Sequence, residues 1–156
     1  MKLGILALAA LTMTGCVSIK TSEVAAPAAE PVAMALDNLE AMAIIQSRNT
    51  LYEKLVAEQD VEGLIALHTE DYTILRPGGA NVEGEAAQRA YWETAFETMN
   101  GLSIDEKDVF FAGPDMIISR DTYQTLQDGY TVSTGQSVII WKKVEGQWLV
   151  HWEMFN

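Results

Sequence analysis

A chain of 156 residues with a formal net charge of −12 is large enough for one domain of ordinary size and is strongly acidic. Such a field repels phosphate backbones, and Lys142-Lys143 is the nearest approach to a basic cluster, so nucleic-acid binding is excluded. The one cysteine, Cys16, has no partner for a disulfide bond. Stability must therefore come from packing.

The N-terminus carries an export pattern. Lys2 gives a short basic start, residues 3–11 form an apolar run too short to span a bilayer, and Thr14-Gly15 places small residues before Cys16. This order resembles a bacterial lipoprotein signal, which implies cleavage after residue 15 and acylation of Cys16. The alternative is an ordinary secretory signal with an incidental cysteine.

Residues 16–36 are predicted to form the lipidated cysteine and a flexible tether. The segment is rich in Ala, Pro, Ser, Thr and Glu, and Pro27 and Pro31 argue against a continuous helix. The acidic charge disfavours contact with anionic lipid, so the acyl chains would supply membrane attachment. Val17 is not the aspartate that commonly retains lipoproteins at the inner membrane, which favours the outer membrane, facing the periplasm.

Helical patterns dominate the next part of the chain. Apolar residues at helical spacing predict a helix from Asp37 or Asn38 to Glu58, and Asp60 is expected to cap a short second helix. A strand is predicted over residues 72–75, ended by the turn Pro77-Gly78-Gly79. A third helix is predicted from about Glu85 to Met99.

Strand patterns replace the helical ones after Gly101. Long strands are predicted over 102–111, 116–127 and 132–144, and a last one over 147–155, with turns at Gly113-Pro114, Asp128-Gly129 and Gly146. A sheet of this length must curve around the helices to cover its apolar face. The expected domain, residues 37–156, is therefore an α+β cone in which a curved antiparallel sheet wraps around three N-terminal helices.

Two segments resemble a known superfamily. The stretch Tyr52 to Pro77, with Leu-His-Thr-Glu-Asp-Tyr-Thr-Ile-Leu-Arg-Pro at its end, and the final hairpin from Trp141 to Asn156 are similar to nuclear transport factor 2-like proteins. The closest likeness is to the SnoaL-like and ketosteroid isomerase-like branch. This resemblance implies a cone-shaped fold but leaves the chemistry open, because the fold hosts enzymes, binders and immunity proteins alike.

The isomerase mechanism can be tested on the matching positions. It needs a carboxylate base and two acidic donors for the enolate oxygen. Tyr52 matches the donor tyrosine, but Arg76 stands at the position of the base and cannot accept a proton. The second donor matches a position near Ile139, which has no proton to share. Steroid isomerisation is therefore not expected.

The expected cavity would hold aromatic and charged residues. Arg76 is predicted at its mouth, where it could clamp a carboxylate, or else pair with an acid such as Glu83 or Glu153. The other predicted ligand-binding residues are Tyr52, Trp92, Trp141 and Phe155. Each of these could equally be a packing residue. His68 is expected near a helix end or at the surface.

Strict alternation divides the last strand into two faces. The resemblance implies that Leu149, His151, Glu153 and Phe155 face the cavity, and His151 with Glu153 would then form an acid–base pair or a structural polar pair. The opposite face, which begins at Trp148, is apolar and predicts a homodimer across the convex sheet. The alternative is that the faces are inverted and these tryptophans are core.

The leading functional hypothesis is non-catalytic binding of a small amphipathic or weakly anionic molecule. The second is a cofactor-free SnoaL-like enzyme of the isomerase, hydratase or cyclase type, using His151 and Glu153 as catalytic residues. The third is a dimeric interaction module. No cofactor or metal site is expected, since His68 and His151 are the only histidines and no ligand pattern surrounds them.

Overall fold

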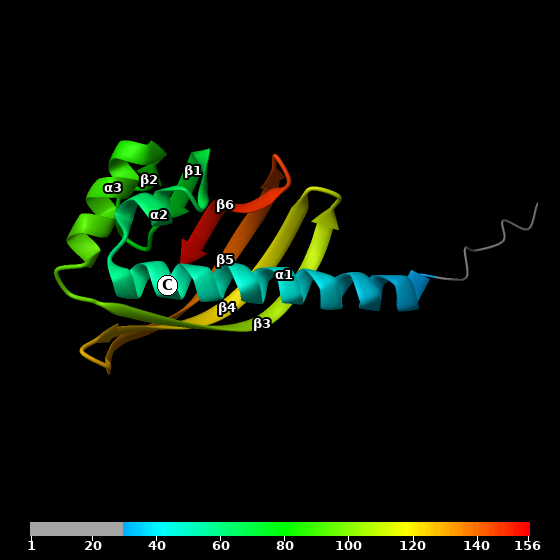
Figure 1. Ribbon diagram of the computed structural model, residues 1–156, viewed down its shortest axis with the longest axis horizontal. Helices are drawn as coiled ribbons and strands as arrows, with labels where there is room; N and C mark the ends of the chain where they lie inside the picture. Colours follow the sequence, from blue (N-terminus) through cyan, green and yellow to red (C-terminus); the bar gives the residue numbers. More distant parts are fainter. Residues whose placement is uncertain (1–29) are drawn as a thin grey trace, which may run out of the picture.

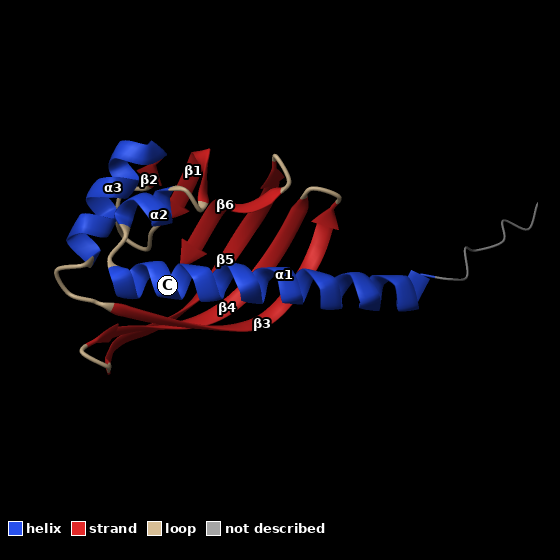
Figure 2. Cartoon of the chain, in the orientation of Figure 1, coloured by secondary structure: helices blue, strands red, loops and turns tan. Residues whose placement is uncertain are grey.

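The computed structural model describes residues 30–156, with side chains from residue 37 onward. Helix α1 (Glu30–Glu58) lies across one face of a curved sheet (Figure 1). Helices α2 (Val61–Ile65) and α3 (Gly84–Ala95) gather at one end of it, beside β1 and β2 (Figure 2). The predicted α+β class is confirmed. In the part of the chain that the structure describes, no helix is long and apolar enough to cross a membrane.

The sheet has six strands in the order β2-β1-β6-β5-β4-β3. The long strands β3 (Gly101–Gly113), β4 (Met116–Gln127), β5 (Tyr130–Val144) and β6 (Gln147–Phe155) form the expected antiparallel meander. Strand β1 (His68–Leu75) instead runs parallel to β6, and the short β2 (Val82–Glu83) pairs with β1. The sheet is therefore mixed, not wholly antiparallel as predicted.

Two hairpin turns were marked correctly by their residue types. Asp128 and Gly129 have φ values of 53° and 81°, and Glu145 and Gly146 have 50° and 82°. Two successive positive φ values define a type I′ turn, whose twist matches that of the flanking strands. These turns therefore fix the register of the β4–β5 and β5–β6 hairpins.

Several element boundaries differ from the prediction, and three of them differ by four residues or more. Helix α1 begins at Glu30, before the expected Asp37, because a proline in the first helical turn loses no hydrogen bond and Pro31 is in that turn. Residues 30–36 of the expected tether are thus helical. Helix α3 ends at Ala95 instead of Met99, and β1 begins at His68 instead of Tyr72.

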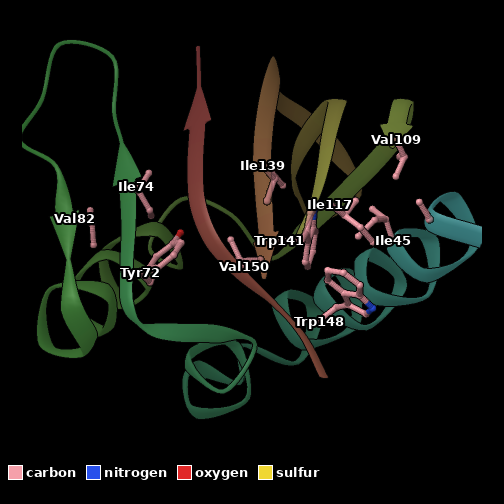
Figure 3. Close-up of a cluster of buried hydrophobic side chains, with 11 residues drawn as sticks. Ile45, Tyr72, Ile74, Val82, Val109, Ile117, Ile139, Trp141, Trp148 and Val150 are labelled. Carbon is pink, nitrogen blue, oxygen red and sulfur yellow. The ribbon is translucent and has the colours of Figure 1, made fainter. Parts of the chain in front are cut away.

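The core consists of two clusters. The first lies between the sheet and the middle of α1, where Ile45 points towards Ile117 of β4, and it includes Trp141 and Trp148 (Figure 3). The second joins the C-terminal half of α1 to α2 and α3 through residues such as Val56, Leu64 and Trp92. Leu39, predicted on the buried stripe of α1, is 68% exposed. The second cluster borders the main cavity.

Candidate functional site: an aromatic cavity with one buried carboxyl group

A cavity of about 500 Å³ opens between the second core cluster and the sheet. Its walls come from α1, from α3 with the turn that follows it, and from strands β3 to β6. Most lining residues are aromatic or aliphatic, including Tyr52, Tyr91, Trp92, Leu102, Tyr123, Val132 and Phe155. Glu153 is the one ionisable acid among the residues that line it. The cavity therefore suits a mostly apolar molecule with a polar group directed at that carboxyl.

Glu153 is placed by β6 and held by β1. The hydroxyl group of Tyr72 donates a hydrogen bond of 3.0 Å to Glu153 Oε2. Burial raises the pKa of Glu153 to about 7, while the Tyr72 hydrogen bond opposes the shift and the negative charge of Asp121 adds to it. A carboxyl group with this pKa is present in both protonation states near neutral pH.

Tyr52 and Trp92 lie together in the cavity wall, as predicted for the candidate site. Their ring centroids are 5.7 Å apart in an edge-to-face arrangement. Tyr52 also contacts the ring of His68 at 5.8 Å. Phe155 lines the cavity from the end of β6. Three of the predicted ligand-binding residues are thus brought to one cavity.

Trp141 does not line this cavity. It is 1% exposed in the first core cluster, and its indole Nε1 donates to Ser119 Oγ at 3.1 Å. Ser119 in turn donates to Asp121 Oδ2 at 2.8 Å. The alternation of β5 places Trp141 on the inner face, two residues beyond Ile139, which pairs with Glu153. The packing alternative for Trp141 is the correct one.

A β-bulge in β6 changes which residues lie on each face, so the faces differ from those predicted by strict alternation. The register skips His151, because Trp141 pairs with Val150 and Ile140 pairs with Trp152. Trp148 and Val150 are consequently buried in the core before the bulge, and Glu153 and Phe155 face inward after it. Strict alternation could not anticipate the extra residue. The face assignment was right for the second half of the strand and wrong for the first.

The bulge also separates His151 from Glu153. His151 Nδ1 lies 3.0 Å from Thr69 Oγ1 and 3.3 Å from Asp71 Oδ1, and its ring stacks on Trp152. His151 is absent from the lining of the cavity that holds Glu153. The predicted acid–base pair of these two residues is therefore not formed.

Arg76 lies beside the cavity and not inside it. It follows β1, is exposed, and lines a second hollow of about 610 Å³ formed with α3. Its guanidinium carbon is 5.8 Å from the centroid of the Tyr91 ring. The predicted ion pairs of Arg76 with Glu83 or Glu153 are not among the salt bridges of the described residues. Tyr91 borders both hollows.

His68 lies at a helix end, one of the two positions expected for it, and it is buried instead of at the surface. Its Nδ1 is 2.6 Å from the carbonyl oxygen of Leu64, at the end of α2, and its ring lies 4.1 Å from that of Tyr72. Burial lowers the pKa of His68 to about 3, so the ring is neutral at physiological pH. Over residues 30–156, no three His, Cys, Asp or Glu side chains gather as metal ligands do.

Sequence reasoning did not identify Tyr72 or Asp121 as members of a polar interior. Asp121 is fully buried on β4, and desolvation raises its pKa to about 7, although the Ser119 hydrogen bond opposes the shift. The signal in the sequence was an acid at an inward position of a strand, next to Ser119. Glu153 pairs directly with Ile139, so the cavity's acid lies one strand away from the position where the isomerase resemblance had placed one.

Residues 49–151 match the SnoaL-like domain family. The chain belongs to that family. No curated protein matches the sequence of this SnoaL-like chain. The family match is consistent with the curved sheet and the cavity between helices and strands.

Solved structures support the same fold. A ketosteroid isomerase-like protein from Erwinia carotovora atroseptica is 20% identical with a TM-score of 0.62, covering 74% of this chain and 95% of its own. An NTF-2-like protein of unknown function from Shewanella oneidensis is 12% identical with a TM-score of 0.64, covering 73% and 97%. A protein of unknown function from Mycobacterium tuberculosis is 20% identical with a TM-score of 0.64, covering 83% and 77%. At these identities the likeness shows the fold alone.

Proposed function

We propose that this SnoaL-like domain binds one small, largely apolar molecule in the cavity lined by Tyr52, Trp92 and Phe155. The observation that carries the proposal is the carboxyl group of Glu153 in a cavity of about 500 Å³ that is otherwise lined mostly by aromatic and aliphatic side chains. A packed core without a ligand role has little use for a half-buried acid at the wall of a hollow. The ligand would bring a polar group to Glu153 and bury its apolar part among the rings.

The protonation state of Glu153 determines which polar group of the ligand can bond to it. As a carboxylate, Glu153 accepts a hydrogen bond from a hydroxyl or N–H group, and as a carboxylic acid it donates to a carbonyl oxygen. With a pKa of about 7, both forms are available at neutral pH. A ligand that carries an anion at this point would be repelled by the carboxylate. The weakly anionic end anticipated for the ligand therefore has to lie elsewhere.

The test compares Glu153→Gln with Glu93→Gln, which removes an exposed carboxylate from α3. The purified protein is screened against small amphipathic molecules by thermal shift, and co-purifying molecules are identified by mass spectrometry. Binding that is weakened about tenfold by Glu153→Gln and unchanged by Glu93→Gln supports the proposal. Binding that is unchanged in both variants places the ligand outside this cavity and contradicts it.

A catalytic role is the second candidate, and the pKa of Glu153 favours it. A general base is most effective when its pKa lies near the working pH. In this version Glu153 moves the proton, Tyr52 and Tyr72 are the nearby phenols, and His151 takes no part because it lies on the other side of the bulge. The candidate predicts a pH–rate profile that titrates near 7 and a turnover that survives His151→Ala.

We also propose a cellular location for the protein, based on its N-terminal sequence. Cys16 and the signal pattern of residues 1–15 lie outside the described residues, and they support a lipoprotein anchored in the outer membrane on the periplasmic side. The binding domain would then sample periplasmic molecules at the end of its N-terminal segment. This proposal depends on residues 2–16 for the lipid anchor and on Val17 for the outer membrane.

We further propose a homodimer across the outer face of the sheet. Strand pairing aligns Phe110, Ile118, Ile140 and Trp152 in one row on this face. Phe110 is 43% exposed and Trp152 is 44% exposed, and Met154, at 40%, lies in the next row. Contiguous apolar surface on a strongly curved sheet favours a partner over water. A second copy would bury the same row on both sides.

A further inference from the structure

The hollow beside Arg76 adjoins the main cavity. Its volume is about 610 Å³, and the two hollows share part of their walls. The shared residues come from α3, the segment after it and the end of β6: Tyr91, Ala95, Thr98 and Phe155. The two hollows are therefore neighbours, and a molecule that occupied both would have to pass over Tyr91 and Phe155.

The Arg76 guanidinium has two neighbours at this second hollow. One side faces the ring of Tyr91, at 5.8 Å from its centroid. On another side lies the turn after β1, where a Cβ added at Gly79 would come within 3.1 Å of an Arg76 terminal nitrogen. Neither neighbour carries a charge, so the guanidinium is not neutralised by them.

Two of the other three arginines of the described domain are paired, and the third, Arg48, has buried guanidinium nitrogens without a partner but lines neither hollow. Arg89 bonds to Glu62 and Glu85, and Arg120 bonds to Asp108. Arg76 forms no salt bridge within the described residues, although the protein carries a net charge of −12. An unpaired cation in a strongly acidic protein is available to an anionic group of a ligand. The second hollow also contains one exposed carboxylate, that of Glu97, which weakens this attraction.

We propose that the two hollows form one bipartite site for a monocarboxylic acid that also carries a hydroxyl group, with an apolar chain or ring between the two. The carboxylate of the ligand bonds to Arg76, its apolar middle crosses Tyr91 and Phe155, and its hydroxyl group donates to Glu153 in the main cavity. This assignment rests on the proposed binding function and adds the ligand class. A dicarboxylic acid is disfavoured, because its second anion would meet Glu153.

The test uses four eight-carbon probes that differ only in their ends: 8-hydroxyoctanoate, octanoate, 1-octanol and octanedioate. Isothermal titration calorimetry on the purified full chain at pH 8 is expected to rank 8-hydroxyoctanoate as the tightest and octanedioate as the weakest of the three acids. Arg76→Gln should weaken both monocarboxylates about tenfold, the usual order for losing a charge-assisted hydrogen bond, and leave 1-octanol unchanged. Arg120→Gln, which removes an equal charge from the outer face, should change none of them.

Two further variants separate the ends of the site. Glu153→Gln should reduce the advantage of 8-hydroxyoctanoate over octanoate and improve the binding of octanedioate. Glu97→Gln should tighten both monocarboxylates about twofold, because it removes the opposing charge beside Arg76. Since Glu97 and Arg76 are exposed, neither Glu97→Gln nor Arg76→Gln is expected to affect folding.

The outcomes distinguish this assignment from the binding function beneath it. If the probes bind and Arg76→Gln weakens the monocarboxylates no more than it weakens 1-octanol, the bipartite site is overturned and the apolar cavity still stands as a binding site. If octanedioate binds as tightly as 8-hydroxyoctanoate, the role of Glu153 in ligand choice is overturned. If none of the probes binds, both the ligand class and the proposed binding of small amphipathic molecules are contradicted.

Discussion

Tyr72 and Glu153 join the two parallel strands of the sheet from the inside, through a hydrogen bond of 3.0 Å between the phenol and the carboxyl group. Tyr72 is itself 1% exposed, and its ring packs against that of His68. The buried phenol of Tyr72 therefore holds the carboxyl group of Glu153 at the cavity wall. Because the phenol stabilises the carboxylate form, it keeps the pKa of Glu153 from rising further.

The first prediction concerns the stability of the protein as a function of pH. The pKa of Glu153 rises from its usual range to about 7 on folding, so between these values the folded state holds a proton that the unfolded state has released. The contribution of Glu153 to the free energy of unfolding should therefore decrease as the pH rises from about 4.5 to 7, by at most about 1.4 kcal/mol per pH unit. His68, whose pKa burial lowers to about 3, contributes a slope of the opposite sign up to about pH 6.5. Urea unfolding of the wild type across this range measures the slope.

Glu153→Gln should make that slope shallower, because an amide does not titrate. In the variant, the slope from Asp121, whose pKa is also raised to about 7, is opposed below about pH 6.5 by the slope from His68. Glu93→Gln serves as the control and should reproduce the wild-type dependence. An unchanged slope in Glu153→Gln would show that the carboxyl group is ionised in the folded state across the whole range.

The second prediction concerns Tyr72→Phe. Removing the donor takes a hydrogen bond from the carboxylate form, so the pKa of Glu153 should rise further above its wild-type value of about 7. The protein should also lose about 1–3 kcal/mol of stability above pH 7, where the unpaired carboxylate would remain buried. Carbon-13 NMR of labelled glutamate reports the pKa directly. A pKa that stays constant or falls would contradict the hydrogen bond.

Much of the fold could be predicted from local patterns. Asp60 accepts a hydrogen bond from the backbone N–H of Gly63, as expected for a helix cap, and the turn residues Asp128-Gly129 and Gly146 lie where the sequence indicates. These features depend on a few neighbouring residues. The parallel pairing of β1 with β6 could not be predicted, because it joins segments far apart in the chain and leaves no periodic signal.

The candidate site was predicted only in part, because local patterns locate residues on regular elements and not on irregular backbone. Tyr52, Trp92, Glu153 and Phe155 do line one cavity, because periodicity divides each element into two faces and the family resemblance indicated which face is inward. The position of His151 depends on a bulge, which breaks the alternation without any glycine or proline to mark it. The position of the Arg76 side chain depends on the turn after β1, and this turn places it at the neighbouring hollow. Irregular backbone therefore accounts for both errors.

The third prediction concerns Gly135 on β5. A Cβ at this position would come within 2.2 Å of the Asn156 carbonyl oxygen and 2.5 Å of the Tyr123 hydroxyl, which are joined by a hydrogen bond of 2.9 Å. Gly135→Ala should therefore displace Tyr123, a residue of the cavity wall, and lower stability by about 1–3 kcal/mol. Thermal unfolding measures the loss. Gly113→Ala, at a strand glycine with nothing within 4 Å of the added Cβ, should have little effect.

The fourth prediction tests the proposed lipid anchor. Cys16→Ser removes the thiol that an acyl chain would occupy, so the protein should move from the membrane fraction to the soluble periplasmic fraction of a bacterial host. Labelling with a palmitate analogue should mark the wild type and not the variant. Secretion of an unlabelled wild type would favour the ordinary signal peptide. Continued membrane fractionation of the variant would contradict attachment through Cys16.

The last prediction tests the proposed dimer through Trp152. Its side chain is 44% exposed in the apolar row of the outer face, so Trp152→Glu would bring two carboxylates together at a symmetric interface. Light scattering at tens of micromolar should give a dimeric mass for the wild type and a monomeric mass for the variant. Tyr130→Glu changes a still more exposed aromatic residue, 79% exposed, at the β4–β5 turn and should leave the mass unchanged. A monomeric wild type would contradict the dimer and leave the outer row facing water.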